Sequence, residues 1–143
     1  EFWRVVLVND VIETIIELYD KNRVNILYAN CLNSDVPDIA DIATRQVVIN
    51  SNSKYKSQLP FRMAHELMHI VYSDSSSHRM VAYHNYDVRN PEEKTANSEA
   101  VKLLVNIYNE NSEEINWINV MNTFGIPAFL ESEVQEAVIS VVK

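Results

Sequence analysis

The stretch FRMAHELMHIVY occupies residues 61–72 and contains neither glycine nor proline. It includes the pattern H-E-x-x-H, formed by His65, Glu66 and His69. On an α-helix, residues four apart lie one turn above each other on the same face. The two imidazoles can therefore bind one metal ion, for which Zn²⁺ is the usual choice. Glu66 lies beside the first histidine, where it can take a proton from water and act as general base.

The residues around this motif make the predicted helix apolar nearly all round, which is typical of a buried central helix. They are Phe61, Met63, Ala64, Leu67, Met68, Ile70, Val71 and Tyr72. Two histidines and a glutamate in such a helix need partners, because unpaired buried polar groups are costly. A metal ion supplies these partners. The alternative is a surface helix whose histidines are only polar residues.

A zinc site of this type needs a third protein ligand. The extended pattern H-E-x-x-H-x-x-G-x-x-H would place glycine at 72 and histidine at 75, but the chain has Tyr72 and Ser75. The other common solution is a glutamate from a second helix, with the fourth position open to water. We therefore expect the third ligand on the next helix along the chain.

That helix is predicted from Asn90 to about Tyr108. At about 100° per residue, Glu93 falls near the middle of its apolar face, whereas Glu92 and Glu99 fall roughly 90° or more away. The apolar face consists of Ala96, Ala100, Leu103, Leu104 and Ile107, with Val101 and Tyr108 at its margin. Glu93 is thus the carboxylate predicted to face the core and the metal.

The two motifs together resemble the ImmA/IrrE family of metallopeptidases. That family pairs H-E-x-x-H with a downstream helix of pattern E-x-x-A-N-x-F-A, which residues 93–100 match except at Glu99, where the family usually has an aromatic residue. The resemblance extends more weakly from about residue 10 to the C-terminal end. It implies an α+β fold of zincin type, with a small sheet beside the helices that carry the metal. Position by position, it implies zinc ligands His65, His69 and Glu93, the catalytic base Glu66, and motif positions Ala96, Asn97 and Ala100.

The resemblance also implies a function, which is zinc-dependent cleavage of a protein substrate. That substrate would be a helix-turn-helix repressor of a phage or other mobile element, and cleavage would relieve repression. The alternative is a non-proteolytic zinc-containing regulatory module that only docks a repressor. Substrate-binding residues, the cleavage site, the activation trigger and the oligomeric state stay open.

Composition limits the partners and the compartment. The 143 residues carry a formal net charge of −8 and no basic run, which disfavours nucleic acid and anionic membranes as partners. No apolar run approaches the length that spans a bilayer. The single cysteine, Cys31, excludes an internal disulfide framework and favours a reducing cytoplasm. We expect one domain over residues 1–143, with a peptidase core at about 10–108 and a helical pair at 115–142.

The N-terminal half predicts a helix followed by strands. Residues 3–8 suit a short strand or a first helical turn, and apolar spacings of three and four from Asp10 predict a helix that ends near residues 20–22. Runs of β-branched and aromatic residues then predict strands at 24–29, 39–44 and 46–50. By resemblance, strand 46–50 would border the cleft as an edge strand that receives an extended substrate. The alternative is an ordinary sheet strand that does not contact substrate.

Two further regions bear on function. Between the metal helices, His78 and His84 are alternative third ligands, and Tyr83, His84 or Tyr86 could stabilise an oxyanion. Near the C-terminus, helices at 115–124 and 127–142 flank a corner like that of a helix-turn-helix. Its second helix begins with acidic residues instead of the arginine or lysine that DNA reading needs, so the pair is predicted to pack or to dock a partner. These residues are Glu131, Glu133 and Glu136.

Overall fold

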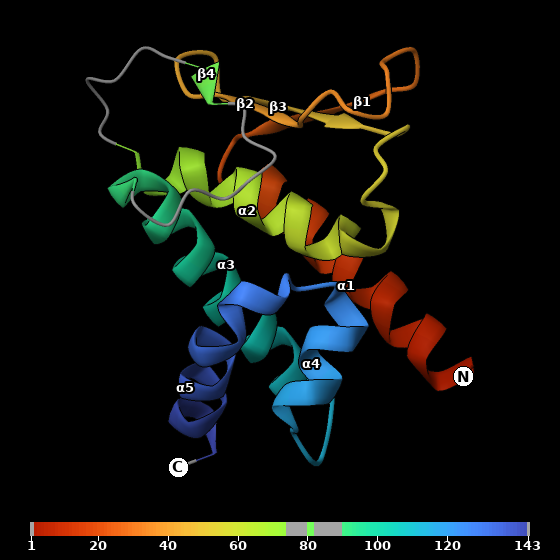
Figure 1. Ribbon diagram of the computed structural model, residues 1–143, viewed down its shortest axis with the longest axis vertical. Helices are drawn as coiled ribbons and strands as arrows, with labels where there is room; N and C mark the ends of the chain where they lie inside the picture. Colours follow the sequence, from red (N-terminus) through yellow and green to blue (C-terminus); the bar gives the residue numbers. More distant parts are fainter. Residues whose placement is uncertain (1, 74–79, 82–89, 143) are drawn as a thin grey trace.

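A computed structural model describes residues 2–73, 80–81 and 90–142 of the chain. These residues form a mixed α+β structure in which a small sheet lies on one side and the helices lie below it (Figure 1). The helices are α1 (Phe2–Lys21), α2 (Leu59–Val71), α3 (Pro91–Glu110), α4 (Trp117–Phe124) and α5 (Glu131–Val141). The strands are β1 (Asn25–Ala29), β2 (Ile39–Asp41), β3 (Gln46–Asn50) and the two-residue β4 (Met80–Val81).

The sheet has the strand order β1-β3-β2-β4. β1 runs parallel to β3, with Leu27 opposite Val48, while β2 runs antiparallel to both β3 and β4. Side chains alternate between the two faces of a strand, and the burial of β3 follows this alternation. Val47 and Ile49 are buried against the helices, whereas Val48 is partly exposed on the opposite face. The sheet therefore has a single core-facing side.

Two predictions about the strands are wrong. β3 lies between β1 and β2 and is not an edge strand, so its backbone is already paired on both sides and cannot add an extended substrate. The strand predicted at 39–44 ends at Asp41, because residues 42–45 form the turn into β3. Arg45 completes that turn with a positive φ of 54°.

The N-terminal prediction also needs a correction. Residues 3–8 belong to α1, which begins at Phe2, so the helix starts well before Asp10 and these residues are not a separate strand. The end of the helix agrees with the prediction. There the Asn22 side chain donates a hydrogen bond to the Leu18 carbonyl (2.8 Å) as the chain turns toward β1.

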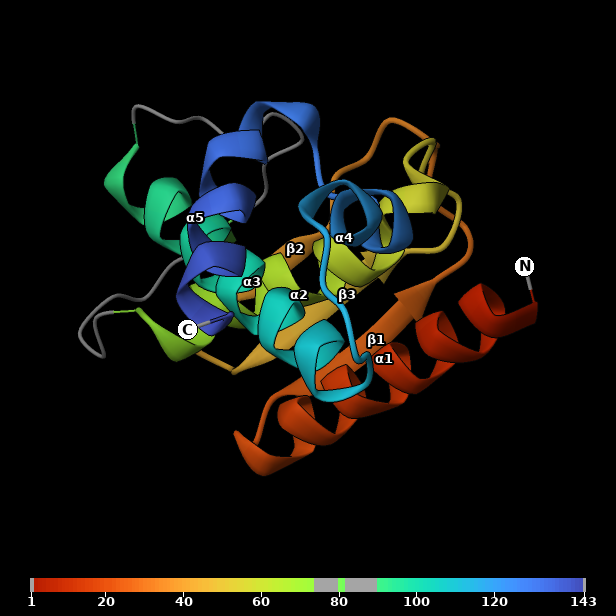
Figure 2. The same cartoon turned by 90° about the horizontal axis from the view of Figure 1, so that it is seen from below.

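α2 occupies the centre of the helical layer. It contacts β2 and β3 above it, α1 on one flank and α3 on the other, and its residues from Pro60 to Ile70 are all buried. Seen from below, α1 borders one side of the layer and α5 the other (Figure 2). A helix contacted from so many directions has no free polar face, which explains the apolar sequence on either side of H-E-x-x-H.

The predicted C-terminal pair is present as α4 and α5, joined through Gly125 and a 3₁₀ turn at Ala128–Leu130. The pair packs on the same core as α2 and α3, through the buried side chains of Val120, Phe124, Leu130, Val134 and Val138. Cys31 is exposed and unpaired. Among the helices that the structure describes, none combines the length and the apolar character needed to cross a membrane.

Candidate metal centre

α2 places both histidines and the neighbouring glutamate inside the protein. Pro60 lies in its first turn, as predicted, where a missing backbone N–H costs no helical hydrogen bond. His65 and His69 are one turn apart, and their ring centroids are separated by 4.7 Å. His65, Glu66 and His69 all have relative exposures of 5% or less. All three side chains must therefore find their partners within the protein.

α3 supplies the third group. Its N-cap is Asn90, whose side-chain oxygen accepts hydrogen bonds from the backbone N–H groups of Glu92 (2.9 Å) and Glu93 (3.4 Å). This cap fixes where the helix begins and hence which residues face α2. Glu93 is fully buried, whereas Glu92 is exposed and Glu99 is partly exposed. The predicted inward orientation of Glu93 is confirmed.

The three side chains converge on one point. The Nε2 atom of His65 lies 3.1 Å from Glu93 Oε1 and 3.1 Å from the Nε2 atom of His69, which in turn lies 2.5 Å from Glu93 Oε2. Ligand atoms arranged tetrahedrally at about 2.0–2.1 Å from a zinc ion are about 3.3 Å apart. The spacing of the two nitrogens and the Oε1 atom is close to that value, so the donor set fits a small cation.

The electrostatics of the cluster favour the protonation states that bind metal. Burial lowers the pKa of His65, which favours the neutral imidazole. Burial raises the pKa of Glu93, but hydrogen bonds from His65 and His69 outweigh this effect and lower the pKa to about 2. Metal ligands must be neutral imidazoles and ionised carboxylates. The buried residues His65, His69 and Glu93 could therefore hold a metal ion.

Glu66 lies beside the cluster without belonging to it. It is buried, and its Oε1 atom has no hydrogen-bond partner among the residues that the structure describes. Burial raises the pKa of Glu66 well above its usual value, and the negative charges of Asp38 and Glu93 add to that effect. The carboxyl group is thus well suited to hold a proton and release it again.

A buried ion pair next to Glu66 was not anticipated from the sequence. Arg62 donates two hydrogen bonds to Asp38, from Nε (2.7 Å) and from Nη2 (2.8 Å), and Nη2 also donates to the Asn50 carbonyl (3.0 Å). The pair joins α2 to the end of β3. A signal for it was present, because an arginine within an otherwise apolar helix needs a buried partner. Its partner lies 24 residues away in the sequence, which periodicity cannot reveal.

Two further polar residues contact α2. Tyr19 of α1 donates its hydroxyl hydrogen to the Met63 carbonyl (2.7 Å). Asn97 of α3 is buried one turn beyond Glu93. The other candidates for the site lie outside the described residues: His78, Tyr83, His84 and Tyr86.

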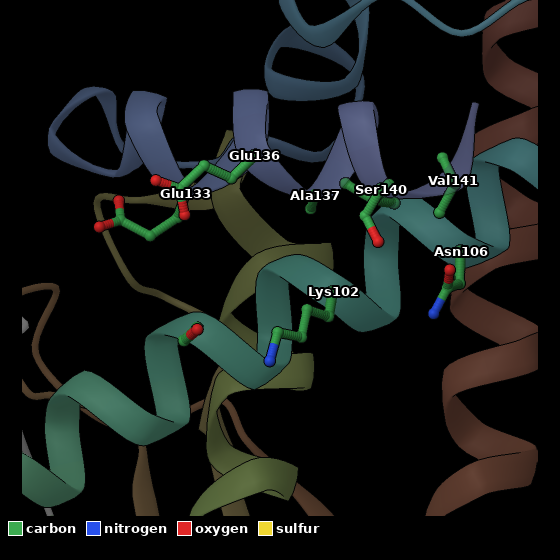
Figure 3. Close-up of a pocket in the computed structure, with 9 residues that line it drawn as sticks. Lys102, Asn106, Glu133, Glu136, Ala137, Ser140 and Val141 are labelled. Atoms are coloured by element: carbon green, nitrogen blue, oxygen red, sulfur yellow. The ribbon is translucent and has the colours of Figure 1, made fainter. Parts of the chain in front are cut away.

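The opposite face of α3 borders a separate groove of about 240 Å³ between α3 and α5 (Figure 3). None of its lining residues belongs to the cluster of His65, His69 and Glu93. They include Ser98, Lys102, Asn106, Glu133, Glu136 and Ser140. α3 thus presents Glu93 and Asn97 to α2 on one face and borders this groove on the other.

In comparisons with known proteins, no family model, no curated protein and no solved structure matches the chain. The resemblance to the ImmA/IrrE family therefore stays a prediction that rests on the two motifs.

Proposed function

We propose that the protein is a zinc-dependent peptidase of zincin type. One observation carries this proposal: three buried donor atoms, from His65, His69 and Glu93, converge beside the buried carboxyl group of Glu66. Two imidazoles and one carboxylate form a ligand set of catalytic zinc sites, in which the fourth position is left for water or substrate. The resemblance of both motifs to the ImmA/IrrE family supports the same assignment.

In this mechanism a bound zinc ion would act as a Lewis acid that polarises the peptide carbonyl and lowers the pKa of water. Glu66 accepts the proton of the attacking water and then delivers it to the nitrogen of the leaving amine. A carboxyl group whose pKa is raised by burial performs both transfers more readily than an ordinary one. The Arg62–Asp38 ion pair keeps this part of α2 in place against the sheet.

The proposed substrate is a helix-turn-helix repressor of a phage or mobile element, and the proposed compartment is the cytoplasm. The substrate follows from the family resemblance alone. With a net charge of −8, the chain is better suited to a protein partner than to nucleic acid. The alternative function is a zinc-containing module that docks a repressor without cutting it.

The test replaces Glu66 by glutamine. Glutamine has nearly the same shape but cannot accept the proton, so hydrolysis of a mixed synthetic peptide library, followed by mass spectrometry, should fall by about a hundredfold or more. Zinc content and melting temperature should stay close to those of the parent. Glu92→Gln is the matched control. Because Glu92 is exposed, this substitution should leave the rate of peptide hydrolysis unchanged.

Parental cleavage by a zinc-loaded Glu66→Gln chain would refute this mechanism. A parent that binds zinc and cleaves neither the library nor a candidate repressor would favour the docking module instead. A parent that prefers Fe²⁺ over zinc would point to the oxygenase chemistry of other two-histidine, one-carboxylate sites.

A further inference from the structure

The groove between α3 and α5 carries charged side chains that the proposed hydrolysis does not use. Glu133 and Glu136 of α5 lie at one end of it, and Lys102 and Asn106 of α3 line it from the other helix (Figure 3). Its volume of about 240 Å³ is below the roughly 300–1,000 Å³ of pockets that bind drug-sized ligands. The groove therefore suits one side chain of a partner better than a cofactor.

The charges that line this groove are unbalanced. Lys102 is the only basic residue among the described residues of the lining, and its Nζ atom already pairs with Glu99 (3.1 Å), which is not part of the lining. Within the described part of the chain, neither Glu133 nor Glu136 forms an ion pair. The Oε2 atom of Glu133 is buried and has no hydrogen-bond partner there either. The groove thus offers negative acceptors that no donor of the described chain occupies.

The dipole of α5 accounts for only part of this arrangement. It favours acidic residues in the first helical turn, which suits Glu131 and Glu133. The effect falls off within that turn, whereas Glu136 lies in the second one. The dipole also acts on carboxylates that stay in water, and it does not explain why one oxygen of Glu133 is buried without a partner. That oxygen is left for a donor from another molecule.

The side chains of the groove favour an organic cation over a metal ion. A calcium ion takes six to eight oxygen ligands, usually from several carboxylates and carbonyls. In the described part of the chain, the only group of three side chains placed to hold a metal ion is His65, His69 and Glu93. Apolar side chains also line the groove, and these suit a ligand that has a hydrocarbon part. They are Val105, Ala137 and Val141.

We propose that this groove docks an arginine side chain of a protein partner. The guanidinium presents five N–H donors in a planar fork that matches carboxylates, here those of Glu133 and Glu136. Its methylene stem packs along the apolar part of the lining, as the stems of long basic side chains commonly do. The net charge of −8 favours the approach of a basic partner. The site does not depend on the proposed peptidase, because it lies on the face of α3 opposite Glu93.

The experiment titrates the ¹⁵N-labelled chain, without metal, with a short blocked peptide of alanines that contains one central arginine. Amide signals of Val105, Asn106 and Ala137 should shift, whereas that of Val48 in β3 should not. A peptide with citrulline in place of arginine has nearly the same shape but no charge, so it should bind about tenfold more weakly or worse. A lysine peptide should bind with intermediate affinity, because an ammonium group lacks the planar fork.

Glu133→Gln should weaken binding of the arginine peptide by about tenfold, and Glu136→Gln should weaken it less, because Glu136 is exposed. Glu131→Gln is the matched control. It makes the same change of charge in the first turn of α5 but does not line the groove, so its affinity should equal that of the parent. Lys102→Met should bind the peptide more tightly, because it removes a like charge from the groove.

Three results would overturn this proposal. The first is equal binding of the arginine and citrulline peptides, or shifts that avoid α3 and α5. The second is parental affinity in Glu133→Gln and Glu136→Gln alike. The third is spermidine that binds the groove more tightly than the arginine peptide, which would make it a polyamine site.

Thermal melting separates binding from folding. Glu133→Gln should melt at or above the temperature of the parent, because the carboxylate oxygen that it replaces has no partner in the described chain. A much lower melting temperature would give Glu133 a structural role and overturn its assignment to the groove. None of these measurements uses zinc or peptidase activity, so failure of the proposed function would leave their outcome unchanged.

Discussion

Arg62 and Asp38 show what burial demands of single residues. Both side chains are less than 9% exposed, and they meet in a two-pronged ion pair whose remaining contacts go to the backbone. Removing one partner of such a pair typically costs about 3–5 kcal/mol, because the other charge is left buried and unpaired. The pair also joins α2, the helix of His65 and His69, to the sheet. Breaking the pair would therefore also weaken the attachment of α2 to the sheet.

At the same scale, the third ligand can be tested with a matched pair of variants. Glu93→Ala should weaken zinc binding by more than the 10–100-fold that is typical of an outer-shell residue, because it removes a donor atom of the cluster. Glu92→Ala is the control. It removes an acidic residue of the same helical turn, but one whose side chain is exposed to solvent. Both variants are measured by chelator competition. Zinc loss confined to the Glu92 variant would contradict the assignment.

Tyr19 predicts a dependence of stability on alkaline pH. Burial raises the pKa of its hydroxyl well above 10, and the charges of Glu66 and Asp38 raise it further. Above pH 10 the unfolded tyrosine therefore loses a proton that the folded one keeps. The free energy of unfolding should fall by about 1.4 kcal/mol per pH unit from this group, starting near pH 10 and ending at the folded pKa.

Tyr19→Phe should remove this contribution, so that its stability falls less steeply than that of the parent above pH 10. Near pH 8 it should lose only about 1 kcal/mol, for the missing hydrogen bond to Met63. Urea denaturation between pH 8 and pH 11 measures both effects. Tyr28→Phe removes a half-exposed hydroxyl and should change the slope much less. Equal slopes for the parent and Tyr19→Phe would show that Tyr19 ionises normally.

At the scale of elements, one glycine decides how α4 joins the rest of the protein. Gly125 ends α4 with φ 65° and ψ 41°, in the left-handed region that a residue with a β-carbon rarely adopts. A β-carbon there would lie 2.1 Å from the Ser57 carbonyl oxygen and 2.5 Å from the α-carbon of Gln58. The turn after α4 therefore lies directly against the 3₁₀ turn (Lys56–Gln58) that leads into α2.

Gly125→Ala should lower the free energy of unfolding by about 2 kcal/mol or more, because left-handed strain of about 1–2 kcal/mol adds to the clash with backbone. Gly125→Asn separates the two causes. Asparagine tolerates the left-handed region but keeps the β-carbon, so this variant should also be strongly destabilised. Urea denaturation gives the values. An asparagine variant as stable as the parent would mean that the close approach to Ser57 is absent.

At the scale of the whole molecule, α4 and α5 are predicted to be required for folding. A chain that ends after Asn111 would lose six buried apolar side chains, those of Val120, Phe124, Ile126, Leu130, Val134 and Val138. Each such side chain stabilises by about 1.5–3 kcal/mol when buried, so their sum approaches the 5–15 kcal/mol of a whole domain. Tyr108 would also lose its ring contact with Phe124, whose centroid lies 5.8 Å away.

The shortened chain should therefore show no cooperative thermal transition by circular dichroism. A chain that ends after Val141 is the control and should melt like the parent, because it loses only an exposed valine and a terminal lysine. Cooperative unfolding of the chain that ends after Asn111 would instead make residues 115–142 a separate unit. That result would contradict the predicted single domain.

Features that depend on local spacing can be predicted from the amino-acid sequence. Residues four apart in H-E-x-x-H must share a helical face, and the apolar pattern after Asn90 turns Glu93 toward the core. Asn90 caps its helix through its own side chain. These relations extend over one or two turns, so they can be read from neighbouring residues alone. The orientation of His65, His69 and Glu93 follows from these local relations.

Relations between segments far apart in the sequence depend on how the chain packs in three dimensions. β3 is a central strand because β1 pairs with the edge of β3 that faces away from β2. The alternation of apolar and polar residues in a strand does not indicate which strands lie beside it. The Arg62–Asp38 pair and the approach of Gly125 to Ser57 likewise join segments that are 24 or more residues apart. Hydrophobic burial is nearly non-directional, so the apolar pattern specifies which faces are covered but not by which neighbours. Packing in three dimensions selects those neighbours and, with them, the surroundings of the His65, His69 and Glu93 cluster.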